Sequence, residues 1–296
     1  MNRHAYLIIA HNDFNILEKL IKLIDDKRND IYLHLDVKAR DVDFKLFKSL
    51  VKESNLYFIK RGNIRWGHYS QIKCEIELLK EATKKEYAYY HLISGVDFLL
   101  KTQDEIHSFF SKNQGKEFIH FCSDKQVEKI KFRIQYYHFV KYNRTANEKI
   151  NRLSGLFDKY TLKLQKKLKL KRKYNENINL KYGCNWFSIA HNLAKYVVES
   201  EAWIHKHFKF TLCGDELFLQ TLVYNSDFKN ALYINDFNDN YEACVRHIDW
   251  NRGEPYIFRL EDFEELIESR QIFARKFSMS IDQDIIGKLY NYLSSR

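Results

Sequence analysis

The chain has 296 residues with only one proline and nine glycines, a composition that excludes a long disordered linker and favours one domain over residues 1–296. Its five cysteines are scattered, which argues against a disulfide framework or a cysteine-based zinc site and indicates reduced thiols in a cytosolic compartment. The formal net charge of +10 suits a polyanionic partner, and most of the excess lies between Lys159 and Lys173.

The first hundred residues alternate short apolar runs with helical patterns. The apolar runs that predict buried strands are 5–11, 30–36, 55–60 and 87–94. The segments with apolar residues at spacings of three and four, which predict helices, are 13–27, 40–53 and 69–82. This order predicts βαβ units and an α/β fold with a mainly parallel sheet flanked by helices.

The second half of the chain has a more mixed pattern. Strands are predicted at 117–122 and 185–190, and helices at 191–199, 215–225 and 260–269. We therefore expect an α/β domain whose C-terminal half is irregular.

Three predicted strand ends carry aspartates, at 11–13, 36–38 and 94–97. In open α/β sheets, ligands bind beyond the carboxyl ends of the strands, so these ends are expected to form a binding site. The sequence contains no glycine-rich phosphate loop of the P-loop or dinucleotide type. If a nucleotide binds here, another device must hold its phosphates.

The lysine-rich segment predicts a basic amphipathic helix that forms an insertion over residues 150–175. Its apolar residues fall at spacings of three and four: Leu153, Leu156, Phe157, Tyr160, Leu164 and Leu168. Such a helix suits an anionic membrane surface, which we expect to be contacted through residues 153–173. The alternative is a solvated helix packed on the domain. Nucleic-acid binding is the least favoured, because no nucleic-acid motif accompanies the charge.

Eight motifs occur in an order that resembles a known family: AYLIIAHND, LHLDVK, IRWGHYSQIK, YYHLISGVDFLLKT, GCNWFSIAHNLAKYVVE, GDELFLQTL, RHIDW and IFARKF. Together they resemble the core-2/I-branching β-1,6-N-acetylglucosaminyltransferases, a family that includes peptide xylosyltransferases. The likeness runs from about Ala5 to Phe277. The chain looks like a bacterial-type member of this family without stem, membrane anchor or disulfides. One departure is Leu99, where the family usually has proline.

The resemblance implies an inverting glycosyltransferase with the A-type glycosyltransferase fold. It implies a UDP-sugar donor, with N-acetylglucosamine as the favoured sugar, and no cofactor or divalent metal, because basic side chains take the diphosphate. The expected acceptor is a hydroxyl of a cell-surface glycan or of its lipid-linked precursor. The enzyme would then be cytoplasmic and peripheral on the inner face of the membrane. The alternatives are a carbohydrate-binding protein without catalysis and a basic nucleic-acid-binding protein.

The stretch TLCGDELFLQTL places Asp215 beside Glu216. The resemblance implies that Glu216 is the general base that deprotonates the acceptor hydroxyl. Asp215 is expected to cap the following helix. For the leaving diphosphate the resemblance implies Lys276, with Arg275 beside it. It also implies a second basic partner upstream, for which the candidates are Arg252 and Arg259, with Arg259 as the weak choice.

The remaining donor-site predictions come from the strand ends and the IRWGHYS motif. Asp36 suits uridine recognition, although a strand-end turn residue explains it equally well. Trp66 is predicted near the nucleotide, with a core tryptophan as the alternative. The other predicted donor-site residues are His11, Ser94, Gly95 and Asp97.

Acceptor recognition is predicted for one arginine and several aromatics, because sugars pack on rings and accept hydrogen bonds from guanidinium groups. These candidates are Arg133, Tyr136, Tyr137 and Trp186, each with a core or surface role as its alternative. The Asp-x-Asp motifs at 41–43 and 282–284 are predicted to be solvated or capping acids and not metal ligands. The donor sugar, the linkage, and the oligomeric state are left open.

Overall fold

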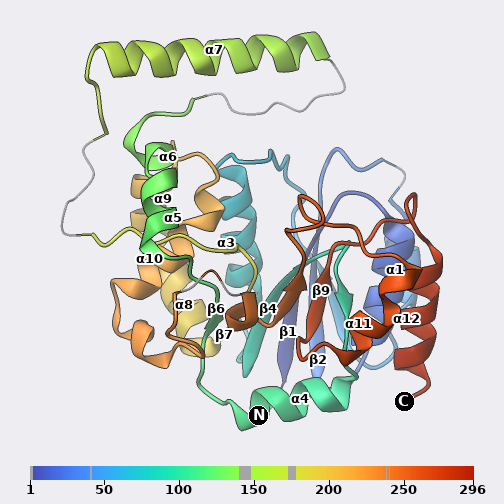
Figure 1. Cartoon of the computed structure of the whole chain (residues 1–296). Coiled ribbons are helices and arrows are strands. Elements are labelled where there is room, and N and C mark those ends of the chain that lie inside the picture. The colour runs from blue at the N-terminus through green and yellow to red at the C-terminus, as the bar shows by residue number, and fades with distance from the viewer. Residues whose placement is uncertain (1–2, 41, 140–147, 173–177, 238, 240) are drawn as a thin grey trace.

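The computed structural model describes residues 3–40, 42–139, 148–172, 178–237, 239 and 241–296. Within these ranges the chain forms two sheets with helices around them (Figure 1). The expected single domain over 1–296 stays a prediction. Lys173 and the end of the expected 150–175 insertion lie outside the described residues, as does Asp41.

The larger sheet has six strands in the order β3-β2-β1-β4-β7-β6. Their bounds are β1 His4–Ala10, β2 Asn29–Leu35, β3 Asn55–Phe58, β4 Tyr89–Ser94, β6 Phe118–Ile119 and β7 Phe187–Ala190. The first four strands run parallel, whereas β7 is antiparallel to both β4 and β6. The predicted fold class, α/β with a mixed and mainly parallel sheet flanked by helices, is confirmed.

Three helices make the crossovers between the parallel strands, as predicted: α1 Phe14–Ile24, α2 Phe44–Ser49 and α3 Ser70–Ala82. Helix α1 packs its apolar stripe into a core cluster with residues of β1 and β2. Helix α3 belongs to a second cluster, which includes residues of β7 and of the helix after it. Helices α1 and α3 thus bury the face that their spacing marks as apolar, whereas the short α2 buries only Phe47.

The sequence pattern missed the second sheet, which has the strand order β5-β9-β8. Its strands are β5 Phe98–Leu99, β8 Arg246–Ile248 and β9 Phe273–Arg275. Strands of two or three residues are too short to show the alternation that predicts a strand. The helix α12 Asp284–Ser294 was also missed, because the segment around 282–284 was expected to be a tail.

The other helices are short, and they lie on both sides of the sheet, with α11 packed against α12 (Figure 1). They are α4 Gln103–Lys112, α5 Asp124–Ile130, α6 Phe132–Gln135, α8 His191–Glu199, α9 Glu201–Phe208, α10 Phe218–Tyr224 and α11 Phe263–Glu268. Helix α4 begins with a capping box in which the side chains of Thr102 and Glu105 each accept from the other's backbone N–H. The predicted helix 260–269 divides into a short 3-10 turn and α11.

Helix α7 Glu148–Lys167 lies apart from these layers, at the end of the molecule where β1, β2 and β4 also end (Figure 1). This is the predicted basic helix. No helix within the described ranges combines the length and the apolarity needed to cross a bilayer.

Arg246 joins the two sheets from inside the core. Its guanidinium donates to the carbonyls of Leu92 and Phe187 and to the Ser188 hydroxyl, at 3.0, 2.7 and 2.9 Å. It also lies over the ring of Phe273, 4.4 Å from the centroid. A buried charge needs such a set of acceptors, so Arg246 fixes β8 and β9 against β4 and β7.

Candidate active site

The ends of β1, β2 and β4 meet at one edge of the sheet, as the sequence predicted. The Asp36 N–H donates to the Ala10 carbonyl at 3.0 Å, and the Gly95 N–H donates to the Ile9 carbonyl at 2.9 Å. A Cβ atom on Gly95 would lie 2.6 Å from the Ala10 Cβ. Gly95 is therefore required for close packing of β1 against the turn after β4, which explains the glycine without a ligand.

Strand β9 brings Arg275 to this edge. Its Nη1 lies 2.6 Å from the Ser94 hydroxyl and 2.6 Å from Asp97 Oδ1. Its guanidinium also lies over the ring of Trp186, 4.6 Å from the centroid. Ser94 and Asp97 are themselves hydrogen-bonded, so the three side chains form one partly buried polar cluster. The structure thus brings together four predicted residues that are far apart in the sequence.

Lys276 lies half-buried beside this cluster. Burial, and then the neighbouring Arg275 guanidinium, lower the pKa of the Lys276 ammonium, while the Asp13 and Asp97 carboxylates oppose this. Within the described part of the chain, its ammonium forms no ion pair. The Phe258 N–H donates to the Lys276 carbonyl at 3.0 Å. A positive charge without a bound counter-charge, at the strand ends, is what a diphosphate requires.

Arg259 follows Phe258 and is exposed, next to the segment that pairs with Lys276. The alternative candidate, Arg252, is instead held by carboxylates: Nη1 lies 2.6 Å from Asp262 and Nη2 lies 2.9 Å from Glu265. The geometry therefore favours Arg259 over Arg252 as the upstream partner.

Asp36 is buried and anchors the loop that follows β3. Its carboxylate accepts from the Lys38 N–H at 2.8 Å and from the Ile64 N–H at 3.0 Å. The Lys38 ammonium lies 3.4 Å from the same carboxylate. His11 lies close enough to Asp36, Lys276 and Arg275 to interact with their charges. The role of Asp36 in uridine recognition stays a prediction, because these contacts already account for its carboxylate.

The loop after Ile64 reaches the segment that carries the candidate base. The Cys213 N–H donates to the Gly67 carbonyl at 2.9 Å, and Gly67 has a φ of 68°. Trp66, which precedes it, is 53% exposed and is not a core tryptophan.

Glu216 is paired with Arg133: their carboxylate Oε2 and guanidinium Nη1 lie 2.7 Å apart. Burial raises the pKa of Glu216, and the Arg133 guanidinium opposes that rise. The Glu216 carbonyl accepts from the Gly183 N–H at 2.9 Å. The Tyr182 ring, beside Gly183, lies 5.5 Å from the Arg133 guanidinium.

The prediction that Asp215 caps a helix is wrong. Helix α10 begins only at Phe218 and has no side-chain cap, and the Asp215 carboxylate turns inward to accept from Gln71 Nε2 at 2.9 Å. Burial, and then the Glu216 carboxylate, raise the pKa of Asp215 to about 7. Asp215 therefore fixes the Glu216 turn against α3.

Among the acceptor predictions, only Arg133 lies at Glu216. Trp186 lies under Arg275, on the donor side. Tyr136 lies near α7, where the Lys166 ammonium is 5.8 Å from its ring. Tyr137 lies there too, with the Arg172 guanidinium 5.5 Å from its ring. The acceptor roles of these three aromatics stay predictions.

Sequence reasoning placed Asp13 at a strand end of the site but gave it no role, and it missed Tyr182 and Glu75. Asp13 has a left-handed backbone with φ 49° and lies near Lys276. Glu75 is buried on the inner face of α3, and burial, with Asp215 nearby, raises its pKa well above the usual value. A glutamate between Ile72 and Ile76 on the core side of a predicted helix was a visible signal.

The Asp-x-Asp motifs have capping roles where they are described, as predicted. The Asp43 carboxylate accepts from the Lys45 and Leu46 N–H groups at 2.9 Å each and caps α2. The Asp282 carboxylate accepts from the Asp284 and Ile285 N–H groups at 2.9 and 3.1 Å, at the start of α12. No cluster of three or more His, Cys, Asp or Glu residues among the described residues is arranged to hold a metal ion.

Known proteins resemble the chain over nearly all its length. Xylosyltransferase 2 of Bos taurus is 24% identical over 318 residues, covering 98% of this chain and 33% of that protein. Xylosyltransferase 1 of Homo sapiens is 24% identical over 312 residues, covering 98% and 30%. The chain thus spans about a third of the length of these curated relatives.

Among solved structures, the apo form of mouse xyloside xylosyltransferase 1 has a TM-score of 0.39 and 10% identity, covering 93% of this chain and 97% of that one. The family model described as Core-2/I-Branching enzyme matches residues 4–266. The chain therefore belongs to the Core-2/I-branching enzyme family of glycosyltransferases, as the sequence motifs indicated.

Proposed function

We propose that this protein is an inverting glycosyltransferase that moves a sugar from a UDP donor to a hydroxyl group of a glycan. The observation that carries the proposal is the position of Glu216 relative to the strand-end cations. Segment 64–67 contacts Asp36 at one end, through the Ile64 N–H, and Cys213 at the other, through the Gly67 carbonyl. Segment 183–186 contacts the Glu216 carbonyl at one end, through the Gly183 N–H, and the Arg275 guanidinium at the other, through the Trp186 ring. The first stretch therefore holds the chain before Glu216 near the strand-end residue Asp36, and the second connects the Glu216 turn to Arg275, which precedes Lys276 in the chain.

The chemistry follows from these charges. An inverting transfer is a single displacement, in which the acceptor hydroxyl loses its proton as it attacks the anomeric carbon. Glu216 accepts that proton, and its raised pKa makes it a stronger base than an ordinary glutamate. Arg133 holds the carboxylate in place and favours its ionised form.

Lys276 stabilises the negative charge that grows on the departing diphosphate. Arg275 supports it from the cluster with Ser94 and Asp97, and Arg259 is the third candidate cation. With these fixed cations in place, the transfer requires no divalent metal and no other cofactor. Trp66, Asp36 and His11 are the proposed contacts to the nucleotide.

The donor sugar is proposed as N-acetylglucosamine, from the motif resemblance. Xylose is the second candidate, because the relatives are named xylosyltransferases. The acceptor is proposed as a cell-surface glycan or its lipid-linked precursor, reached from the cytoplasmic side of the membrane.

The test is turnover and binding of UDP-sugars in EDTA. UDP should raise the melting temperature of the wild type, and UDP-N-acetylglucosamine or UDP-xylose should be hydrolysed or transferred. Glu216→Gln should lower kcat by about 10²- to 10⁴-fold while UDP still binds. Glu199→Gln, an exposed change at the end of α8, is the matched control. The proposal fails if UDP produces no shift, or if Glu216→Gln keeps wild-type turnover.

The ion pair allows a second measurement. Glu216 must be ionised to act as a base, so activity should fall as pH drops through its raised pKa. Arg133→Met removes the cation that opposes the rise, and should therefore move the acid limb of the pH profile of kcat/KM to higher pH. An unchanged limb would show that Arg133 does not act on the base.

Two other functions have different signatures in these assays. A carbohydrate-binding protein without catalysis would show no turnover with any UDP-sugar. A nucleic-acid-binding protein would bind polyanions with a steep dependence on salt and would not respond to UDP.

A further inference from the structure

We propose that α7 docks the protein on an anionic lipid surface by inserting its apolar stripe among the headgroups. This outer stripe consists of Leu153, Leu156, Phe157, Tyr160, Leu164 and Leu168. All six side chains are exposed, between 41% and 67%. The described part of the chain therefore leaves this stripe largely uncovered, which is the reverse of an ordinary surface helix.

The inward face of α7 is polar. Asp158 and Gln165 are buried, at 5% and 7% exposure. The Gln165 side chain donates to the Tyr137 carbonyl at 2.9 Å and accepts from the Tyr137 N–H at 2.8 Å. These two bonds fix how the helix is turned about its axis, because they would be lost if the apolar stripe rotated inward.

The segment after α7 is held by Arg172. Its backbone N–H donates to the Gln135 carbonyl at 2.8 Å, and its guanidinium donates to Thr211 Oγ1 at 2.8 Å and to the His207 carbonyl at 2.6 Å. The helix is therefore attached to the body through polar contacts, and its outward orientation is built into the fold.

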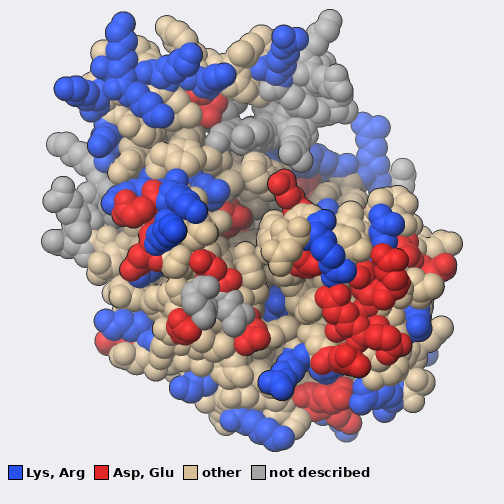
Figure 2. Space-filling model, in the orientation of Figure 1, with Lys and Arg blue, Asp and Glu red and all other residues tan. Residues whose placement is uncertain are grey.

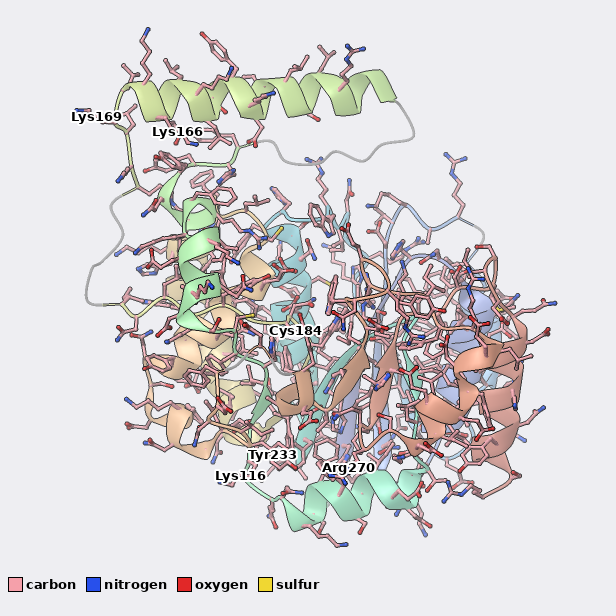
Figure 3. All side chains as sticks on the ribbon, viewed as in Figure 1. Lys116, Lys166, Lys169, Cys184, Tyr233 and Arg270 are labelled. Atoms are coloured by element: carbon pink, nitrogen blue, oxygen red, sulfur yellow. The ribbon has the colours of Figure 1, made fainter. Side chains whose placement is uncertain are left out.

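Charge identifies the occupant of this surface. The exposed cations on the described part of α7 and just after it are Arg152, Lys159, Lys163, Lys166, Lys167, Lys169 and Lys171. Between residues 152 and 172 the only acid is Asp158, and it faces inward. Figure 2 shows Lys and Arg side chains gathered over α7, and Figure 3 shows Lys166 and Lys169 at its C-terminal end.

An anionic bilayer accounts for both the exposed apolar stripe and the cations of α7. Leucine and aromatic side chains enter the boundary between headgroups and acyl chains, while the neighbouring lysines meet the lipid phosphates. A second copy of the chain would bring two rows of lysines together, at a cost in repulsion. A nucleic acid would use the lysines but leave the stripe in water.

The position of α7 gives this docking a direction. The helix lies at the end of the molecule where β1, β2 and β4 end (Figure 1). Docking through α7 therefore brings the strand-end site to the lipid surface. If the proposed function holds, that orientation suits an acceptor carried on a lipid.

The test is co-sedimentation of the full chain with vesicles of phosphatidylcholine alone and with 3:1 phosphatidylcholine and phosphatidylglycerol. The wild type should bind the anionic vesicles at least tenfold more tightly. L156Q/F157Q should bind the anionic vesicles at least tenfold more weakly than the wild type. K163Q/K167Q should bind them more weakly by about fivefold for each lysine removed. K45Q/K48Q, two exposed lysines on α2, should change binding less than either variant.

Four results would overturn the proposal. The first is equal binding to neutral and anionic vesicles, and the second is full binding by L156Q/F157Q. The third is a wild-type dimer that becomes monomeric in L156Q/F157Q without either form binding vesicles. The fourth is salt-sensitive binding to single-stranded DNA that is tighter than binding to vesicles and is the same for the wild type and L156Q/F157Q. UDP-sugar turnover without vesicles should be unchanged in all variants, so a failure here would leave the proposed function standing.

Discussion

Helices α1 and α7 have the same apolar spacing but opposite surroundings. The inward stripe of α1 consists of Ile16, Leu17, Leu20, Ile21 and Ile24, and all five are fully buried. The stripe of α7 repeats the spacing of three and four, yet all six of its residues are exposed. Spacing therefore determines that a helix has an apolar face, but not what that face meets.

The difference comes from how each helix is connected and held. Helix α1 lies between the adjacent parallel strands β1 and β2, and a crossover of this kind must lie on the sheet. Helix α7 belongs to an insertion between α6 and β7, and its polar residues make the bonds to the body. A stripe is buried only where the connections force it onto a core.

The largest expected effect tests the two stripes directly. Leu20→Ala in α1 should destabilise the fold by about 2 to 5 kcal/mol, because it leaves a cavity in the core. Leu156→Ala in α7 should change the free energy of unfolding by less than about 0.5 kcal/mol. Denaturant unfolding of both variants measures this. Equal losses would mean that the stripe of α7 is buried in solution.

The central core and α7 can also be compared through a buried acid in each, Glu117 and Asp158. Glu117 immediately precedes β6, its carboxylate accepts from the Ala190 N–H at 2.8 Å, and burial raises its pKa to about 8 from the ordinary 4.5. With a raised pKa in the folded state, its contribution to stability is present below pH 4.5 and lost as pH rises through 8.

Glu117→Gln should therefore stabilise the fold by about 2 kcal/mol at pH 7 and leave it unchanged at pH 4. The control for Glu117→Gln is Asp158→Asn, the same acid-to-amide change at a buried residue on the inward face of α7, outside the central core. Urea unfolding at the two pH values gives the result. A Glu117→Gln gain that is the same at both pH values would show that the carboxyl group is not the cause.

The smallest expected effect concerns the attachment of α7. Gln165→Ala removes two hydrogen bonds to Tyr137. It should weaken the packing of α7 against the rest of the protein by about 1 kcal/mol, with little effect on the free energy of global unfolding. Hydrogen exchange in α7 should become faster in this variant. Lys163→Ala, on the exposed side, is the control. Unchanged exchange would mean that other contacts orient the helix.

The parallel half of the sheet was predictable because its strands are long apolar runs separated by periodic helices. The predicted strand 5–11 became His4–Ala10, and the predicted helix 69–82 became Ser70–Ala82. The second half was less predictable: the predicted strand 117–122 has only two strand residues, Phe118 and Ile119. Short strands depend on their neighbours and not on local pattern.

The candidate site likewise has residues that the sequence predicted and contacts that it could not predict. Motif order pointed to Glu216 and Lys276, and the strand-end rule pointed to Ser94 and Asp97. The pairing of Glu216 with Arg133 had no local signal, because the two residues are 83 positions apart. The inward turn of Asp215 to Gln71 was equally invisible, so a helix cap was the simpler hypothesis.

The sequence by itself determined the family, the α/β order and the existence of a basic amphipathic helix, because each depends on residues that are near in the chain. Only the tertiary structure decided that Arg275 joins Ser94 and Asp97 over Trp186, and that α7 turns its leucines outward. The physical reason is that burial and ion pairing are set by distant segments packing together, and local spacing carries no record of which segments meet.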